Sequence, residues 1–295
     1  MILDHARRLK RRILEAYWGW RTDCPPLGDT IVILLTNPRS GSTWLFDMLR
    51  THPRIMMHPR YRIHPLLGLH GRRYPRDLSN GTDCSKRIEV LPEQWELIPD
   101  LSIDLPLSPD DSPIHLEKIH PHFFHYDADA LLGRINELRR EHRVEFIYQV
   151  RDPKQTLVSF LEYKRRNPTW DNRTLPEIAT HMQRIFETME RVFQHIPGPT
   201  VEYSILSDHP ERVVQRLFSF ITGDHPLTDS QIEKILHATR RDKKAEGETS
   251  FVGTTRSDDL VERYGDYFST HCDEIESCYT AYTSLRDSGT RLFQT

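Results

Sequence analysis

The sequence predicts an α/β fold in which helices flank a central parallel β-sheet. Three observations support this prediction. Strand-like apolar runs recur along the chain, segments with helical spacing separate them, and the runs IVILL (31–35) and VEFIYQV (144–150) are almost continuously apolar. Strands that alternate with helices favour a parallel sheet, and continuous apolar runs are typical of strands that are buried on both faces.

The expected elements follow one another along most of the chain. The predicted strands are IVILL (31–35), IHLEKI (114–119), VEFIYQV (144–150) and PTVEYSIL (199–206). The predicted helices cover residues 42–50, 128–142, 154–166, 175–196 and 210–221. We expect a single domain over 1–295, with an insertion over about 52–112 that covers the site and a mostly helical C-terminal part over 222–295.

Composition excludes several classes of protein. Hydrophobic residues make up 37% and charged residues 28%, as in soluble globular proteins. Lys plus Arg is 40 and Asp plus Glu is 43, a net charge of -3 that argues against a nucleic-acid binder, so any anion site must be local. No apolar stretch reaches the roughly 20 residues of a membrane span.

The N-terminus and the cysteines bear on location. The basic N-terminal stretch MILDHARRLKRRILEAYWGW predicts an amphipathic helix, either packed on the domain or lying on a membrane surface. The four cysteines lie far apart and form no C-x-x-C pair. They indicate neither a zinc site nor a disulfide framework, and we therefore expect a cytoplasmic protein.

The loop TNPRSGSTW (36–44) follows the first predicted strand, where ligands bind in open parallel sheets. Gly41 allows a turn that brings backbone N–H groups close to a ligand, and Ser42 and Thr43 begin a helix whose positive end attracts anions. Arg39 adds a fixed charge. One interpretation is an anion cradle, and the other is a turn with a capped helix. The loop is not a Walker loop, because Ser42 stands in the lysine position and the first glycine is absent.

A second strand exit has a similar character. VEFIYQV ends in Arg151-Asp152-Pro153, and Pro153 can begin a helix because the first helical turn does not need its missing N–H donor. Ser159 lies one to two turns into that helix. Arg151 and Ser159 can jointly hold a second anion beside the first. Two such exits in one α/β domain favour anion binding over two ordinary capped helices.

These residues carry a family resemblance. PRSGSTWL resembles the 5′-phosphosulfate loop of sulfotransferases that use 3′-phosphoadenosine 5′-phosphosulfate (PAPS). VRDPKQTLVSF resembles their 3′-phosphate motif, with the same separation of Arg and Ser, and VEYSILSDHPERVVQRLFSFI is similar to their strand with Tyr and the helix after it. The likeness spans about 31 to 221. It implies a P-loop-NTPase-like sulfotransferase fold and a PAPS-dependent sulfotransferase of the EC 2.8.2 class.

The resemblance also implies roles for individual residues. The 5′-phosphosulfate would be held by Arg39, Ser40, Gly41, Ser42 and Thr43. The 3′-phosphate would be held by Arg151 and Ser159, Tyr203 would lie near the adenine, and Trp44 would either pack near the adenine or belong to the core. Arg39 stands where cytosolic relatives carry Lys, whereas carbohydrate and tyrosyl-protein relatives carry Arg. The family's late Arg-Lys-Gly segment has no clean copy here, and the best candidate is SFVGTTR (250–256), through Gly253, Thr254 and Arg256.

Transfer of a sulfuryl group to an alcohol also needs a base. His120 is the first candidate, because EKIHP resembles the family's segment with Lys-Thr-His and an imidazole has a pKa of ~6.5. Glu117 and His58 compete for this role. Alternatively, the cluster His120, His122, His125 and Asp127 could bind a metal, although sulfuryl transfer requires none.

The predicted function is transfer of a sulfuryl group from PAPS to a hydroxyl or amine, leaving 3′-phosphoadenosine 5′-phosphate (PAP). The acceptor would be a small molecule or a glycan, bound between residues 52–112 and 165–173. The segment HPRYRIHPLLGLHGRRYPR suits a polar or anionic acceptor, and a solvated basic surface explains it equally well. Two alternatives stay open: a P-loop-like nucleotide kinase, and a non-catalytic sulfotransferase-like scaffold that binds a nucleotide or a partner.

Overall fold

A computed structural model of the chain describes residues 30–52, 54–56, 114–166, 173–223, 227–239 and 261–289. Within these ranges, a five-stranded sheet has the order β2-β3-β1-β4-β5, and every neighbouring pair of strands is parallel. The strands are β1 (Thr30–Thr36), β2 (Ile55–Met56), β3 (Ile114–Ile119), β4 (Arg143–Val150) and β5 (Thr200–Glu202). The predicted parallel α/β fold is confirmed, with β1 at the centre of the sheet.

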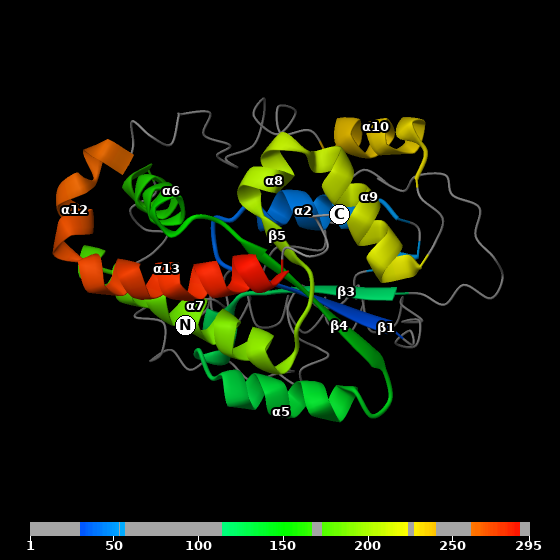
Figure 1. The fold of residues 1–295 in the computed structure, drawn as a ribbon, viewed down its shortest axis with the longest axis horizontal. Helices are drawn as coiled ribbons and strands as arrows, with labels where there is room; N and C mark the ends of the chain where they lie inside the picture. Colours follow the sequence, from blue (N-terminus) through cyan, green and yellow to red (C-terminus); the bar gives the residue numbers. More distant parts are fainter. Residues whose placement is uncertain are drawn as a thin grey trace, which may run out of the picture.

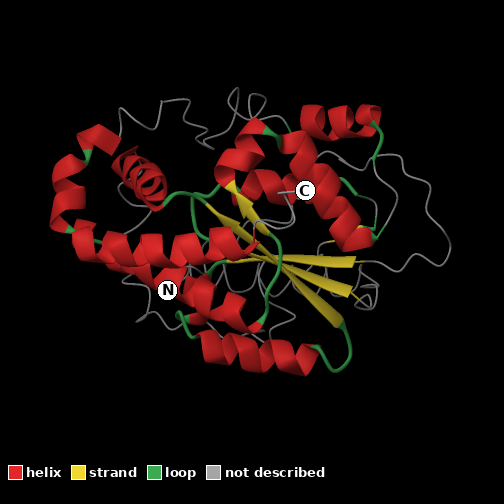
Figure 2. Cartoon of the chain, viewed as in Figure 1, coloured by secondary structure: helices red, strands yellow, loops and turns green. Residues whose placement is uncertain are grey.

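Helices cover both faces of this sheet (Figures 1 and 2). The first face packs against α5 (Ala128–Leu138), α6 (Pro153–Arg166), α7 (Leu175–His195) and α13 (Cys272–Gly289). The second face packs against α2 (Ser42–Leu49), α8 (Tyr203–Asp208), α9 (Pro210–Thr222) and α10 (Asp229–Ala238). A short 3-10 helix, η2 (Pro121–Phe124), follows β3, and α12 (Gly265–Thr270) precedes α13.

Strand β1 divides its side chains between two apolar clusters. Ile31, Ile33 and Leu35 belong to the cluster on the α7 face, whereas Val32 and Leu34 belong to the cluster on the α2 face. Successive side chains of a strand point to opposite faces, so a strand that is covered on both sides must be apolar at every position. This requirement explains the continuous run IVILL.

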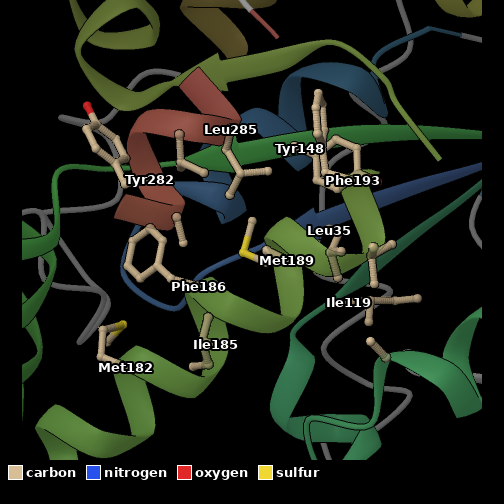
Figure 3. Packing of buried hydrophobic residues seen from close by; sticks show 14 of the residues in the cluster. Leu35, Ile119, Tyr148, Met182, Ile185, Phe186, Met189, Phe193, Tyr282 and Leu285 are labelled. Atoms are coloured by element: carbon tan, nitrogen blue, oxygen red, sulfur yellow. The ribbon is translucent and has the colours of Figure 1, made fainter. Parts of the chain in front are cut away.

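Helix α7 contributes more residues to the apolar cluster on its face of the sheet than any other described helix. Its buried residues recur every three or four positions, as an amphipathic helix requires, and they include Met182, Ile185, Phe186 and Met189. In Figure 3, Phe186 lies near Tyr282 of α13, and Met189 lies near Leu285 of α13 and Leu35 of β1. Ile185 and Met182 lie further along the same helix. The central strands and α13 are therefore held in one core.

Two predicted boundaries were wrong. The predicted strand 199–206 ends at Glu202, and α8 begins at Tyr203. The reason is that β4 ends at Val150, which pairs with Glu202, so the chain beyond Glu202 has no strand beside it. The predicted helix 128–142 ends at Leu138 and is followed by a turn.

Other expectations lie partly or wholly outside the described residues. The expected N-terminal helix (1–20) and nearly all of the expected insertion (52–112) fall there, so these features and the single-domain organisation stay predictions. The C-terminal part is helical where it is described, in α10, α12 and α13. Among the described helices, none combines the length and the apolar character that crossing a membrane requires.

Candidate functional site

The carboxyl edge of the sheet gathers the residues that the sequence singled out. The loop with Arg39 follows β1, His120 follows β3, Arg151 follows β4 and Tyr203 follows β5. All these strands run in the same direction, so their ends meet at one edge, where open α/β sheets bind ligands. We call the part built on β1 and β4, which carries the two predicted anion sites, the phosphate side, and the part built on β3, which carries the predicted base, the acceptor side.

The loop after β1 turns sharply and delivers the chain to the start of α2. Arg39 (φ 64) and Gly41 (φ 81) both adopt the left-handed conformation. Helix α2 begins at Ser42 with no side-chain cap at Gly41 and no acidic residue in its first turn. Its first N–H groups and its positive end are therefore available to an anion, which favours the anion cradle over an ordinary capped helix.

Ser40 and Gly41 serve this loop in different ways. The Ser40 side chain is buried and its hydroxyl lies 2.6 Å from that of Thr36, so its hydrogen bond is made within the loop. A Cβ atom on Gly41 would lie 2.7 Å from ring carbons of Tyr203. Gly41 is needed here both for its positive φ and for this close approach.

The loop after β4 is fixed by Asp152. One oxygen of its carboxylate accepts the backbone N–H of Gln155 (2.9 Å), and the other accepts the hydroxyl of Tyr279 on α13 (2.7 Å). Pro153 is the first residue of α6, as predicted. These contacts hold the start of α6, and with it the neighbouring Arg151, beside the first loop.

Hydrogen bonds join the two loops into one unit. Each joins the loop after β1 to β4, to α6 or to the loop between them: Asn37 Nδ2 to Thr156 Oγ1 (3.1 Å), Arg39 Nε to Ser159 Oγ (3.3 Å), Gln149 Nε2 to the Ser40 carbonyl (2.9 Å) and Arg151 Nη1 to the Arg39 carbonyl (3.3 Å). Arg39, Arg151 and Ser159, which the sequence assigned to two anion sites, therefore form one continuous assembly.

Aromatic rings support both arginines. The guanidinium of Arg39 lies 4.6 Å from the ring centre of Tyr163, and that of Arg151 lies 4.3 Å from the ring centre of Tyr203. Cations at this distance from an aromatic face are attracted to it. Tyr203, which the resemblance placed near the adenine, therefore contacts Gly41 of the first loop and Arg151 of the second loop.

Trp44 packs against the apolar cluster on the α2 face, which includes Leu45 and Val201. Its indole Nε1 is buried and has no hydrogen-bond partner among the described residues. This packing favours the core alternative for Trp44 over contact with an adenine.

On the acceptor side, His120 is oriented by the end of β1. Its Nδ1 lies 2.8 Å from the Thr36 carbonyl oxygen. A carbonyl can only accept a hydrogen bond, so Nδ1 carries the proton in the neutral ring and Nε2 carries the lone pair. The ring of His122 stacks on that of His120, with centroids 5.5 Å apart and planes 9° from parallel. His120 is therefore held as the tautomer that can accept a proton at Nε2.

A buried histidine continues this group of rings. His181 on α7 lies edge-on to His122 at 5.4 Å and is hydrogen-bonded to the Tyr126 hydroxyl. Burial holds the pKa of His181 well below its ordinary value of 6.5, and the positive charges of Arg173 and Arg184 lower it further. His181 is therefore neutral at physiological pH.

The other candidate bases and the last binding segment are placed differently. Glu117 lies within β3, in register with Ile33 and buried. His58, Gly253, Thr254 and Arg256 lie outside the described residues, so their roles stay predictions. Within the described ranges, no group of three or more His, Cys, Asp or Glu side chains is arranged to hold a metal ion.

The sequence reasoning missed four residues of this site: Asn37, Lys118, Gln149 and Tyr163. Lys118 extends from β3 towards α2, with Nζ 3.4 Å from the Thr43 hydroxyl. Lys118 and Gln149 are polar interruptions near the ends of apolar strands, which is a signal that could have identified them. Tyr163 stands one helical turn after Ser159, and its contact with Arg39 depends on how α6 crosses the loop.

Comparisons with known proteins identify the family of the chain. A family model described as "Sulfotransferase domain" matches residues 29–272. The sequence matches none of the curated proteins. Similar solved structures include mouse sulfotransferase SULT7A1 complexed with PAP, which has 13% identity, a TM-score of 0.47, and coverage of 86% of this chain and 89% of that one.

Two further sulfotransferase structures have similar identities and TM-scores. The sulfotransferase domain from the curacin biosynthetic pathway has 14% identity, a TM-score of 0.48, and coverage of 86% of this chain and 97% of that one. The sulfotransferase from Alicyclobacillus acidocaldarius has 13% identity, a TM-score of 0.45, and coverage of 83% and 94%.

Proposed function

This chain belongs to the sulfotransferase domain family, and we propose that it transfers a sulfuryl group from PAPS to a hydroxyl or amine of a small molecule or glycan. The observation that carries the proposal is the hydrogen bond from Arg39 Nε to Ser159 Oγ, which joins the two anion loops. PAPS has one anionic group on each side of its ribose. Two adjoining anion sites on a rigid edge of the sheet suit such a nucleotide.

The phosphate side supplies the binding groups. The N–H groups at the start of α2 and the hydroxyls of Ser42 and Thr43 would hold the 5′-phosphosulfate. Arg151 and Ser159 would hold the 3′-phosphate through hydrogen bonds that its negative charge strengthens. Arg39 and Lys118 would stabilise the negative charge that develops on the bridging oxygen as it leaves with the nucleotide.

His120 would act as the base. Its Nε2 would take the proton of the acceptor hydroxyl while Nδ1–H stays on the Thr36 carbonyl, which also stabilises the imidazolium that forms. The acceptor oxygen forms a bond to sulfur as the bond from sulfur to the bridging oxygen breaks. We prefer His120 to Glu117 because the Glu117 side chain is buried within the body of β3.

The two alternatives make different demands. A kinase would need a group to replace the Walker lysine, and Ser42 stands in that position. A non-catalytic scaffold would need no oriented base, whereas His120 is held in a base-competent tautomer. A cytoplasmic location remains our prediction from the wide spacing of the cysteines.

Sulfuryl transfer tests the proposal. PAPS would be incubated with the protein and a panel of phenols, alcohols, amines and oligosaccharides, with and without EDTA, and PAP formation measured. We expect acceptor-dependent PAP formation that survives EDTA and is lost in Arg39→Ala. If the protein bound PAP but formed no PAP from PAPS with any acceptor class, the result would support the non-catalytic scaffold. Transfer of a phosphoryl group from ATP to an acceptor would support the kinase.

A further inference from the structure

Tyr163 is placed to control the side chain of Arg39. It lies on α6 four residues after Ser159, so both side chains face the same way along the helix. The Arg39 side chain lies along this helix face. Its Nε donates to the Ser159 hydroxyl (3.3 Å), and its guanidinium covers the Tyr163 ring at 4.6 Å from the ring centre.

The backbone of Arg39 is fixed as well. Its φ of 64 is a conformation that few residues other than glycine adopt, and its carbonyl accepts a hydrogen bond from Arg151 Nη1. A long arginine side chain on a fixed backbone can still sample many rotamers, and binding an anion would require it to give up that freedom. Contacts that fix the side chain before the nucleotide binds reduce this cost.

We propose that Tyr163 is a positioning residue that holds the Arg39 guanidinium between the two phosphate-binding groups before the nucleotide arrives. The inference rests on the proposed function. The proposed role belongs to the ring face of Tyr163, because the Arg39 guanidinium lies over that ring. Tyr163 contacts Arg39 and needs no contact with the reacting atoms.

Calorimetry with PAP tests this role without an acceptor. The variants are Tyr163→Phe, Tyr163→Leu, Arg39→Ala and the double variant Tyr163→Leu/Arg39→Ala. We expect Tyr163→Leu to weaken PAP binding roughly threefold to tenfold, the size of a partly desolvated cation–π contact, and Tyr163→Phe to bind as the unaltered protein does. In the Arg39→Ala background, Tyr163→Leu should have no further effect, because the group that it positions is gone.

Three results would overturn the inference: an unchanged affinity in Tyr163→Leu, additive losses in the double variant, or the same loss in Tyr163→Phe. If the unaltered protein did not bind PAP, the proposed function would fail, and this role with it, so the two failures can be told apart. Should Tyr163→Leu not fold, as judged by thermal unfolding, Tyr163→Met removes the ring and replaces it with a flexible side chain that fills irregular space better than Leu does.

Discussion

The phosphate side and the acceptor side of this site are held by different kinds of contact. On the phosphate side, hydrogen bonds between side chains and backbone connect β1, β4 and α6, as in the bond from Gln149 to Ser40. On the acceptor side, the candidate base His120 is oriented by the Thr36 carbonyl oxygen at the end of β1, and its ring stacks on that of His122. The comparison indicates that the nucleotide end is held by hydrogen bonds between several elements of the fold, whereas the candidate base is oriented by the end of one strand and by ring stacking.

The largest expected effect separates the two sides. His120→Ala should lower kcat about 10²- to 10⁴-fold, because a general base is lost, while leaving PAP affinity nearly unchanged. Stopped assays of PAP formation and calorimetry would give the two values. His125→Asn is the matched control, since His125 is an exposed histidine in the same segment and Asn tolerates its positive φ. A large loss of PAP affinity in His120→Ala would contradict the assignment of nucleotide binding and proton transfer to separate sides of the site.

Arg151→Ala should weaken nucleotide binding and leave proton transfer to His120 unchanged. Loss of a charged hydrogen-bond donor should weaken PAP binding about 10- to 100-fold, and should weaken binding of adenosine 5′-monophosphate far less, because that nucleotide lacks the 3′-phosphate. Arg140→Ala, which removes an exposed charge elsewhere, is the control. Equal losses for both nucleotides would contradict the assignment of Arg151 to the 3′-phosphate.

Gly41→Ala tests the backbone of the first loop. The new methyl would carry the left-handed strain of about 1–2 kcal/mol and would also overlap the Tyr203 ring. Gly223→Ala is a matched control, since Gly223 has a φ of 69 and nothing within 4 Å of the added Cβ. Urea unfolding should show a larger loss for Gly41→Ala, together with weaker PAP binding. Equal destabilisation in the two variants would mean that the approach of Tyr203 is of no consequence.

The smallest effect concerns pH and the buried ring on the acceptor side. The pKa of His181 is lower in the folded protein than its ordinary value of 6.5, so below about pH 6.5 the unfolded chain binds a proton that the folded protein does not. Stability should therefore fall as pH falls below 6.5, by at most about 1.4 kcal/mol per pH unit from this residue. Urea unfolding at pH 7.5 and 5.5 should show a smaller difference in His181→Gln. An unchanged difference would mean that His181 is protonated in the folded state.

Much of this arrangement could be predicted from the sequence. Continuous apolar runs alternating with helices implied a parallel sheet, and a parallel sheet implies that the strand ends meet. That reasoning alone brings the segments containing Arg39, His120 and Arg151 to one edge. It also separates these residues from Glu117, which lies within a strand rather than after one.

Other features depend on geometry that local patterns do not contain. The end of β5 at Glu202 is set by the length of its neighbour β4, not by its own β-branched residues. In the sequence, Gln149 is a single polar residue in an apolar strand. Its role becomes clear only from the structure, in which its Nε2 donates a hydrogen bond to the Ser40 carbonyl oxygen. The contact of Tyr163 with Arg39 requires the crossing of α6 over a loop that is more than a hundred residues away in sequence.

The central claim is that the joined loops bind a nucleotide phosphorylated on both sides of its ribose. Calorimetry of the unaltered protein with PAP, with adenosine 5′-monophosphate and with ATP plus Mg²⁺ tests it most directly. The account predicts that PAP binds about 10- to 100-fold more tightly than adenosine 5′-monophosphate, because only PAP engages Arg151 and Ser159. Equal affinity for these two nucleotides, or a preference for ATP with Mg²⁺, would contradict it.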